Sequence, residues 1–169
     1  SGEGQDWYFM AYGHNYKKAL KDFTTFAGKV PLPPRYAFGY WWSRYWSYSD
    51  DELRDLTAKF DAYDIPLDVL VIDMDWHYVN PGRGGWTGYT WNRSLFPNPA
   101  QFLQYLKGKK LQVTLNLHPA GGIEPYEERY KDMANWMGMD PSSKQRIDYC
   151  GSDKRFMSGW LNTILRPME

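Results

Sequence analysis

The fold follows from the segment Ile65-Pro66-Leu67-Asp68-Val69-Leu70-Val71-Ile72-Asp73-Met74-Asp75-Trp76-His77, where an apolar run ends in two carboxylates, a tryptophan and a histidine. Between Leu67 and Ile72 the only charged residue is Asp68, and three of the six residues are β-branched. Such a run is typical of a parallel strand covered by helices on both faces. Because sites in such folds lie where the strands end, the segment predicts polar chemistry at the carboxyl end of a buried strand.

Apolar spacing on either side of this segment predicts an alternation of strands and helices. Helices are expected from a cap at Asn15 to Gly28, from a cap at Ser49 or Asp50 to Tyr63, and over 99–107, 127–137 and 153–165. Further strands are expected over 7–12, 35–42 and 111–117. The residues expected to face inward are Leu53, Leu56, Phe60 and Tyr63 in the second helix and Phe156, Trp160, Leu161, Ile164 and Leu165 in the last. A long loop over 77–98 suggests a function, since structureless loops of that size are uncommon.

Repeated β-α units predict a parallel sheet with right-handed crossovers, in a doubly wound sheet or a (β/α)8 barrel. A dinucleotide-binding sheet needs a Gly-rich turn after its first strand, and residues 42–48 contain no glycine. The barrel is therefore favoured, although a complete barrel takes about 250 residues and this chain has 169. We predict an α/β fold: the N-terminal portion, about three β/α units, of a (β/α)8 TIM barrel over 31–169, preceded by a short strand and helix over 1–30.

Composition and charge exclude several classes of function. Twenty basic and twenty acidic residues cancel, so the chain lacks the positive surface that nucleic acid or an anionic membrane requires. No run approaches the ~20 apolar residues that span a bilayer, and residues 1–6 have no signal-peptide character. The single Cys150 rules out an internal disulfide and a multi-cysteine metal site, and it leaves the compartment open, a periplasmic or secreted parent included. Aromatic residues make up 18% of the chain, and such rings serve both cores and sugar-stacking platforms.

Several short segments occur along the chain in a characteristic order and spacing: residues 12–13, 31–39, 43–45, 65–68, 73–76, 86–92, 96–99 and 116–123. In this order and spacing they resemble the family 31 glycoside hydrolases, which are mostly retaining α-glucosidases, α-xylosidases and related enzymes. Each is a weak signal alone, but together they cover almost the whole chain. The resemblance implies a catalytic barrel of an α-glycosidase.

The resemblance also implies roles for particular residues. Asp73 resembles the acid that hydrogen-bonds hydroxyls of the sugar in the cleavage subsite, and an ionised carboxylate can accept two such donors. Arg44 and Tyr45 resemble the basic-aromatic pair that lines the pocket after the first strand. Asp75 and Trp76 are expected to line the same site, since Asp75 shares the side of Asp73 while the strand stays extended.

His118 follows the predicted third strand, in a segment that the family uses to shape this pocket. It either donates to a sugar hydroxyl or only braces its loop. Simpler alternatives also stay open for other residues: Asp73 as a cap of the following loop, and Tyr45 as rim packing. A metal site of His77, His118, Asp73 and Asp75 is disfavoured, because histidines on separate loops lack a metal-ligand spacing. The resemblance implies no metal and no cofactor.

The catalytic pair of such an enzyme has no counterpart in this chain. Retaining glycosidases need two carboxyl groups about 5–5.5 Å apart that flank the scissile bond. The resemblance implies a nucleophilic aspartate at the end of the fourth strand and an acid/base near the sixth, and no residue up to Glu169 matches either. Asp73 and Asp75 would stand side by side on one strand and would not flank the bond.

The sequence therefore predicts a fragment of a retaining α-glycosidase that hydrolyses terminal α-linked glycosyl residues. The chain would supply sugar-binding residues but no catalytic residue, and alone it would be inactive. Its expected partners are an α-linked oligosaccharide or glycoside, the remainder of the barrel and, through exposed strand edges, copies of itself. Two alternatives remain: a non-catalytic carbohydrate-binding α/β domain, and an α/β enzyme of another class using Asp73, Asp75, His77 and His118.

Overall fold

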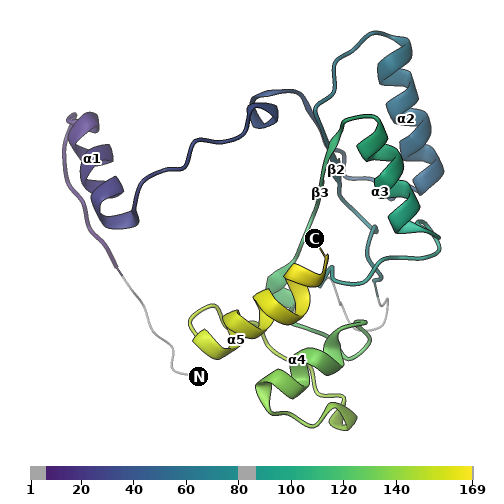
Figure 1. The fold of residues 1–169 in the computed structure, drawn as a ribbon. Coiled ribbons are helices and arrows are strands. Elements are labelled where there is room, and N and C mark those ends of the chain that lie inside the picture. Colours follow the sequence, from purple (N-terminus) through teal and green to yellow (C-terminus); the bar gives the residue numbers. More distant parts are fainter. Residues whose placement is uncertain (1–6, 80–86, 169) are drawn as a thin grey trace. The chain divides into compact units, whose positions relative to one another are not determined.

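The computed structural model describes residues 7–79 and 87–168 (Figure 1). Trp86, which belongs to one of the family-like segments, and Glu169 lie outside the described residues. The chain separates into two compact units, Ser1–Pro34 and Arg35–Glu169. The candidate site residues that the sequence analysis singled out all lie in the second unit.

The first unit contains an irregular segment and the helix α1, Tyr16–Ala27. As predicted, Asn15 caps this helix, because its side chain accepts a hydrogen bond from a backbone amide three residues on at 3.2 Å. The strand predicted over 7–12 is wrong, since these residues are irregular. Their contacts with α1 are made by side chains, with the ring centroids of Tyr8 and Phe26 4.6 Å apart. Side-chain contact with a helix provides no backbone partner of the kind a strand requires.

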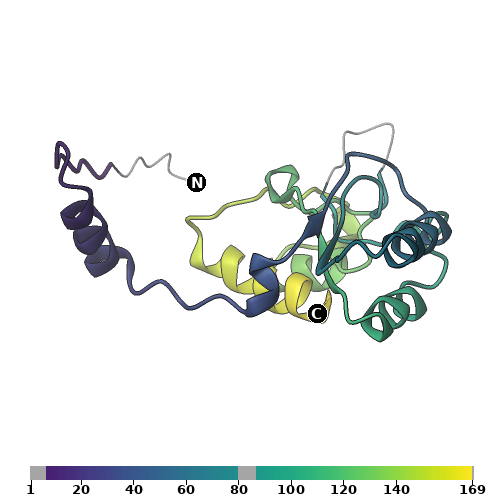
Figure 2. The ribbon, with the colours of Figure 1, turned by 90° about the horizontal axis from the view of Figure 1, so that it is seen from above.

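The second unit is built on a parallel sheet that has three strands within the described residues. The strands are β1 (Trp41–Trp42), β2 (Val69–Ile72) and β3 (Gln112–Leu115), in the order β1-β2-β3. Helix α2 (Asp50–Ala62) follows β1, and helix α3 (Pro99–Gly108) follows β2. Both helices lie side by side on the same side of the sheet (Figure 1, Figure 2). This arrangement is the predicted β-α-β alternation in a parallel sheet.

The strand predicted over 35–42 is correct only for its last two residues. Residues Arg35–Phe38 form a 3-10 turn instead. Asp68 binds the backbone just before β1, because its carboxylate accepts a hydrogen bond from the Tyr40 amide at 2.9 Å and its amide donates to the Tyr40 carbonyl at 3.0 Å. Gly39 lies so close to this carboxylate that any side chain there would collide with it. The single charge in the apolar run thus contacts the two residues that precede β1.

Polar caps begin α2 and α3 at the predicted places. Ser49 and Glu52 form a capping box: the Ser49 amide donates to the Glu52 carboxylate at 2.8 Å, and the Glu52 amide donates to the Ser49 hydroxyl at 3.3 Å. The Asn98 side chain accepts a hydrogen bond from the Gln101 amide at 3.1 Å. These caps begin the two helices that precede and follow β2 in the chain.

The chain after β3 is helical but more broken than predicted. It contains α4 (Tyr130–Met137), α5 (Lys154–Gly159), a π-helical turn at Trp160–Leu165 and 3-10 turns at Pro119–Gly121, Pro141–Ser143 and Arg166–Met168. The helix predicted over 127–137 begins three residues later. The helix predicted over 153–165 is divided between α5 and the π-helical turn.

Two apolar clusters form the core of the second unit. The first lies between β2, α2 and α3 and contains Leu53, Leu70, Ile72, Trp76, Phe96, Phe102, Leu106 and Leu111. The second lies around α4 and α5 and contains Tyr89, Ile123, Tyr130, Met133, Ala134, Ile147, Phe156 and Ile164. The predicted inward faces are wrong at Tyr63, which is 75% exposed just past the end of α2, and at Leu161, which is 43% exposed. Leu161 lies in the π-helical turn, whose wider spacing moves it off the apolar face.

The long loop after β2 folds back on itself. His77 and Trp91 form an antiparallel bridge. Around this bridge the Tyr78 amide donates to the Thr90 carbonyl at 2.7 Å, and the Asn92 amide donates to the Trp76 carbonyl at 2.8 Å. The returning arm therefore lies directly beside the carboxyl end of β2.

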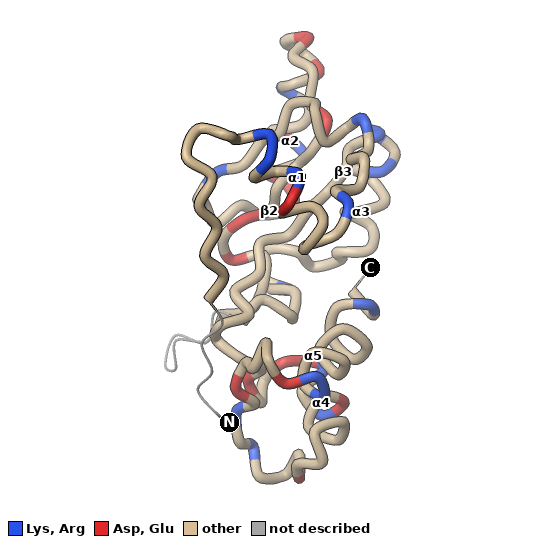
Figure 3. Tube along the Cα trace, turned by 90° about the vertical axis from the view of Figure 1, so that its left-hand side faces the viewer, with Lys and Arg blue, Asp and Glu red and all other residues tan. Residues whose placement is uncertain are grey.

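Charged residues of both signs are interspersed along the chain (Figure 3). Several of them pair locally, as Arg54 does with Asp50 at 2.5 Å and Arg146 with Asp148 at 2.7 Å. Within residues 7–79 and 87–168, every helix is too short or too polar to cross a bilayer.

Candidate functional site

The ends of β2 and β3 carry a hydrogen-bonded pair of polar side chains. Asp73 directly follows β2, and Asn116 directly follows β3. The Asn116 side-chain amide donates to Asp73 Oδ1 at 2.5 Å, and the Asn116 backbone amide donates to the Ile72 carbonyl at 3.1 Å. Both side chains are half-buried. The structure therefore holds an acceptor carboxylate in one orientation at the carboxyl end of the sheet.

Trp76 contacts this pair through Asn116 and is fully buried. Its indole nitrogen donates to the Asn116 carbonyl at 2.8 Å. Its ring packs edge-on against Trp91, with centroids 4.9 Å apart, and is part of the first core cluster. Because no part of the ring reaches solvent, Trp76 can act on a ligand only through the residues that it holds.

The chain is not extended from Asp73 to Asp75, so the condition on which a shared side was expected is not met. β2 ends at Ile72, and Asp75 has a left-handed backbone conformation with φ of 56°. Its carboxylate accepts a hydrogen bond from the Ser47 hydroxyl. The contact ties the loop after β1 to the loop after β2.

Arg44 and Tyr45 lie in the loop after β1, and both are exposed. The Arg44 guanidinium lies 4.6 Å from the centroid of the Trp46 ring and 3.5 Å from the Tyr48 hydroxyl. It lines a crevice of about 360 Å³ beside α2. Tyr45 is 72% exposed. Within the described residues, the structure thus pairs Arg44 with aromatic rings and not with Asp73.

The two histidines at this end of the sheet differ in burial. His77 is buried, His118 is half-buried, and their ring centroids lie 6.1 Å apart. Burial lowers the pKa of His77, while the carbonyl of Tyr78, 3.3 Å from its Nδ1, partly opposes this. Gly88, with φ of 80°, lets the returning arm approach, since a Cβ there would lie 3.2 Å from the His77 ring. In the described ranges no three His, Cys, Asp or Glu side chains are arranged to hold a metal ion.

Glu127 is a residue that the sequence did not single out. Its side chain is buried, at 4% exposure, and accepts a hydrogen bond from the Thr90 hydroxyl. That hydroxyl also accepts from the Glu128 amide at 3.0 Å, so Glu127 links the start of α4 to the returning arm of the loop. Burial raises the pKa of Glu127 to about 7, and the hydrogen bonds from Thr90 and the Tyr89 backbone oppose the rise. In the sequence, three acids among residues 124–128 look like an exposed turn, so no signal marks this one.

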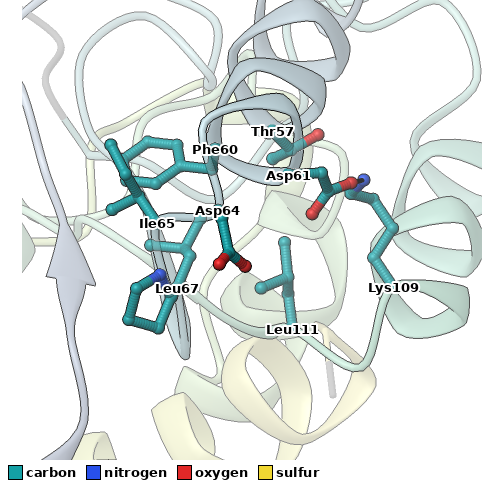
Figure 4. Close-up of a pocket in the computed structure, with 9 residues that line it drawn as sticks. Thr57, Phe60, Asp61, Asp64, Ile65, Leu67, Lys109 and Leu111 are labelled. Carbon is teal, nitrogen blue, oxygen red and sulfur yellow. Dashed lines mark hydrogen bonds and ion pairs between the residues drawn. The ribbon is translucent and has the colours of Figure 1, made fainter.

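A cavity of about 540 Å³ lies at the opposite end of the strands, where β2 and β3 begin. Figure 4 shows its apolar wall, the Asp64 carboxylate in its centre and Lys109 reaching toward Asp61. The Lys109 ammonium and the Asp61 carboxylate form an ion pair. Because ligands in parallel α/β folds bind at the carboxyl ends of the strands, we assign the site to the end that carries Asp73.

Comparisons with known proteins agree with this architecture. Residues 30–163 match the model of the Glycosyl hydrolases family 31 TIM-barrel domain. The chain is 35% identical over 125 residues to Alpha-glucosidase 2 of Bacillus thermoamyloliquefaciens, covering 74% of this chain and 15% of that protein. It is 31% identical over 126 residues to Alpha-xylosidase of Saccharolobus solfataricus, covering 75% and 16%. The crystal structure of the GH31 alpha-xylosidase from Xanthomonas citri superposes with a TM-score of 0.57 at 23% identity, over 72% of this chain and 13% of that one. The chain thus spans about 15% of the length of the curated relatives it matches.

Proposed function

Because the chain belongs to glycosyl hydrolase family 31, we propose that it is part of a retaining α-glycosidase that hydrolyses terminal α-linked glycosyl residues. In this proposal residues 31–169 form about the first three β/α units of the catalytic barrel, and residues 1–30 precede it. The names of the relatives, an α-glucosidase and an α-xylosidase, support an α-glycoside as substrate. Family membership also argues against an α/β enzyme of another class.

The observation that carries the proposal is the held carboxylate of Asp73. Asn116 takes one lone pair of Oδ1, so Oδ2 remains available to accept hydrogen bonds from sugar hydroxyls. Charge-assisted hydrogen bonds of this kind are roughly twice as strong as neutral ones, and they orient the ring. We assign supporting roles at the rim of the site to Arg44, Tyr45 and His118.

Two further assigned residues act less directly. The Asp75 carboxylate is engaged by Ser47, so Asp75 shapes the loops around the site. Trp76 acts from the core by holding Asn116. In this proposal neither aspartate is catalytic, because a retaining pair must flank the scissile bond, and Asp73 and Asp75 belong to one short turn after β2. The chain alone is then a sugar-binding part of the enzyme and is inactive.

The remainder of the barrel is the proposed main partner. β1 and β3 each have one neighbour within the described sheet, so each leaves one backbone edge unpaired there. Unpaired edges attract other strands, and in their absence copies of the same chain. We therefore propose self-association when the chain is isolated.

The experiment compares the full-length enzyme with the 169-residue chain on chromogenic α-glucosides and α-xylosides. Substituting Asp73→Asn in the full-length enzyme should lower kcat/KM about 100-fold, because hydrogen bonds to a charged acceptor are lost or weakened. Asp132→Asn is the control, since that carboxylate is 59% exposed on α4. Turnover by the chain alone would refute the proposal that it lacks the catalytic pair. An unchanged kcat/KM in the Asp73 variant would refute its binding role.

A non-catalytic carbohydrate-binding domain is the second candidate. It is favoured by the aromatic rings beside α2, where Tyr45 is 72% and Trp46 is 50% exposed. In that case the full-length protein would bind α-glycosides without turning them over.

A further inference from the structure

We propose that Asn116 is a positioning residue that holds the Asp73 carboxylate in its sugar-binding orientation, with the buried Trp76 holding Asn116 in turn. The inference rests on the proposed function, because it concerns the same carboxylate. It gives a residue at the end of a second strand, β3, a part in binding the sugar.

The backbone of Asn116 is held from two directions. Its amide donates to the Ile72 carbonyl at 3.1 Å, which extends the pairing of β3 with β2 by one residue. Its carbonyl accepts from the Trp76 indole at 2.8 Å. The indole belongs to a fully buried ring in the first core cluster, so this donor is itself immobile. The side-chain amide of Asn116 therefore starts from a rigid platform.

The Asp73 carboxylate has less support from its own strand. β2 ends at Ile72, so Asp73 is already outside the ladder, and the chain turns into a left-handed conformation at Asp75. A carboxylate at such a place can rotate among several rotamers. The 2.5 Å hydrogen bond from Asn116 selects one of them before any ligand arrives. Preorganisation of this kind improves binding because less rotamer entropy is lost when the ligand binds.

A neutral donor is the side chain that this position requires. An amide donates to an ionised carboxylate without adding charge, whereas an apolar side chain would leave Oδ1 without its donor. A second carboxylate would repel the first unless the pair shared a proton. Other titratable groups that the structure describes also lie in the loops at this end of the sheet. They are Arg44, Tyr45 and Tyr48 after β1, Asp75, His77, Tyr78, Tyr89 and Arg93 after β2, and His118, Glu124, Tyr126, Glu127, Glu128 and Arg129 after β3.

The test uses Asn116→Leu and Asn116→Asp in the full-length enzyme, with kcat/KM for a chromogenic α-glycoside measured from pH 5 to pH 8. Asn116→Leu should lower kcat/KM about 10- to 100-fold at every pH, as expected for losing one hydrogen bond to a charged group. Asn116→Asp should show a similar loss at pH 8 and recover toward the wild type as the pH falls, because a shared proton restores the hydrogen bond. Asn135→Asp, an exposed position on α4, makes the same charge change and should leave the wild-type pH profile unaltered.

The pH profile separates positioning from mere structural support. A loss in Asn116→Asp that is equal at every pH would overturn the positioning role, and so would wild-type kcat/KM in both variants. Thermal unfolding of each variant identifies a loss that comes from misfolding, in which case the pH-dependent recovery would be absent. An inactive wild-type enzyme would instead overturn the proposed function itself, and the role of Asn116 with it.

Discussion

Glu127 should make the stability of this chain depend on pH in a specific way. Burial raises its pKa to about 7 from the ordinary value of 4.5. Below pH 4.5 the side chain is protonated in both the folded and the unfolded chain, so its whole contribution to the free energy of unfolding is present. As the pH rises toward 7, the unfolded chain releases the proton while the folded chain retains it. The free energy of unfolding therefore falls across this range, and above pH 7 the contribution from Glu127 is lost.

The size of the loss follows from the difference between the two pKa values. Each pKa unit corresponds to about 1.36 kcal/mol, so the free energy of unfolding should fall by about 3 kcal/mol between pH 4 and pH 8 from this group. Glu127→Gln removes the ionisation and keeps an acceptor for the Thr90 hydroxyl. The variant should therefore gain stability relative to the wild type as the pH rises.

The assay is urea unfolding of the wild type and the variant at several pH values, followed by tryptophan fluorescence. The difference in unfolding free energy between the two proteins cancels the contributions of all other titrating groups, including the buried His77. Glu128→Gln is the matched control, because the Glu128 carboxylate, next to Glu127 in the sequence, is 57% exposed. Its free energy of unfolding should stay within about 0.5 kcal/mol of the wild-type value. A difference between Glu127→Gln and the wild type that is constant from pH 4 to pH 8 would refute the reasoning.

Two further substitutions test the packing that positions the site. Gly39→Ala should cost about 1–3 kcal/mol of unfolding free energy, because its Cβ would meet a carboxylate beneath it. Gly108→Ala, with nothing within 4 Å of the added carbon, should change it by less than about 1 kcal/mol; equal effects in chemical unfolding would contradict this reading. Trp76→Phe should cost about 2–4 kcal/mol, because it removes a donor 2.8 Å from a carbonyl and leaves a gap in the core. Trp46→Phe, at a half-exposed ring, is its control, and a similar melting temperature for both variants would count against a structural role for Trp76.

Local patterns account for the parts of the fold that were predicted correctly. Ser49 with Glu52 three residues later is a capping signature that depends only on neighbours, and α2 begins there. Asn98 followed by Pro99 marks the start of α3 in the same way. The β-branched run after Leu67 predicted a parallel strand, and β2 pairs in parallel on both sides.

Contacts between distant residues account for most of the errors. The strand predicted over 35–42 is shorter, and the residue before it, Tyr40, binds the carboxylate of Asp68, 28 residues away. The segment 7–12 has apolar and aromatic residues that suit a strand, but those side chains pack against α1. Regular helical spacing, which places every third or fourth residue inward, fails at Leu161 because the helix there widens into a π-helical turn.

The sequence by itself determined the family, the parallel β-α-β order and the position of Asp73 at the end of a strand, because motifs and periodicity are properties of neighbouring residues. Only the tertiary structure decided that Asn116 bonds to Asp73 across 43 residues, that the backbone turns at Asp75, and that Glu127 is buried against Thr90 across 37 residues. These features depend on which strand ends and loops meet in space.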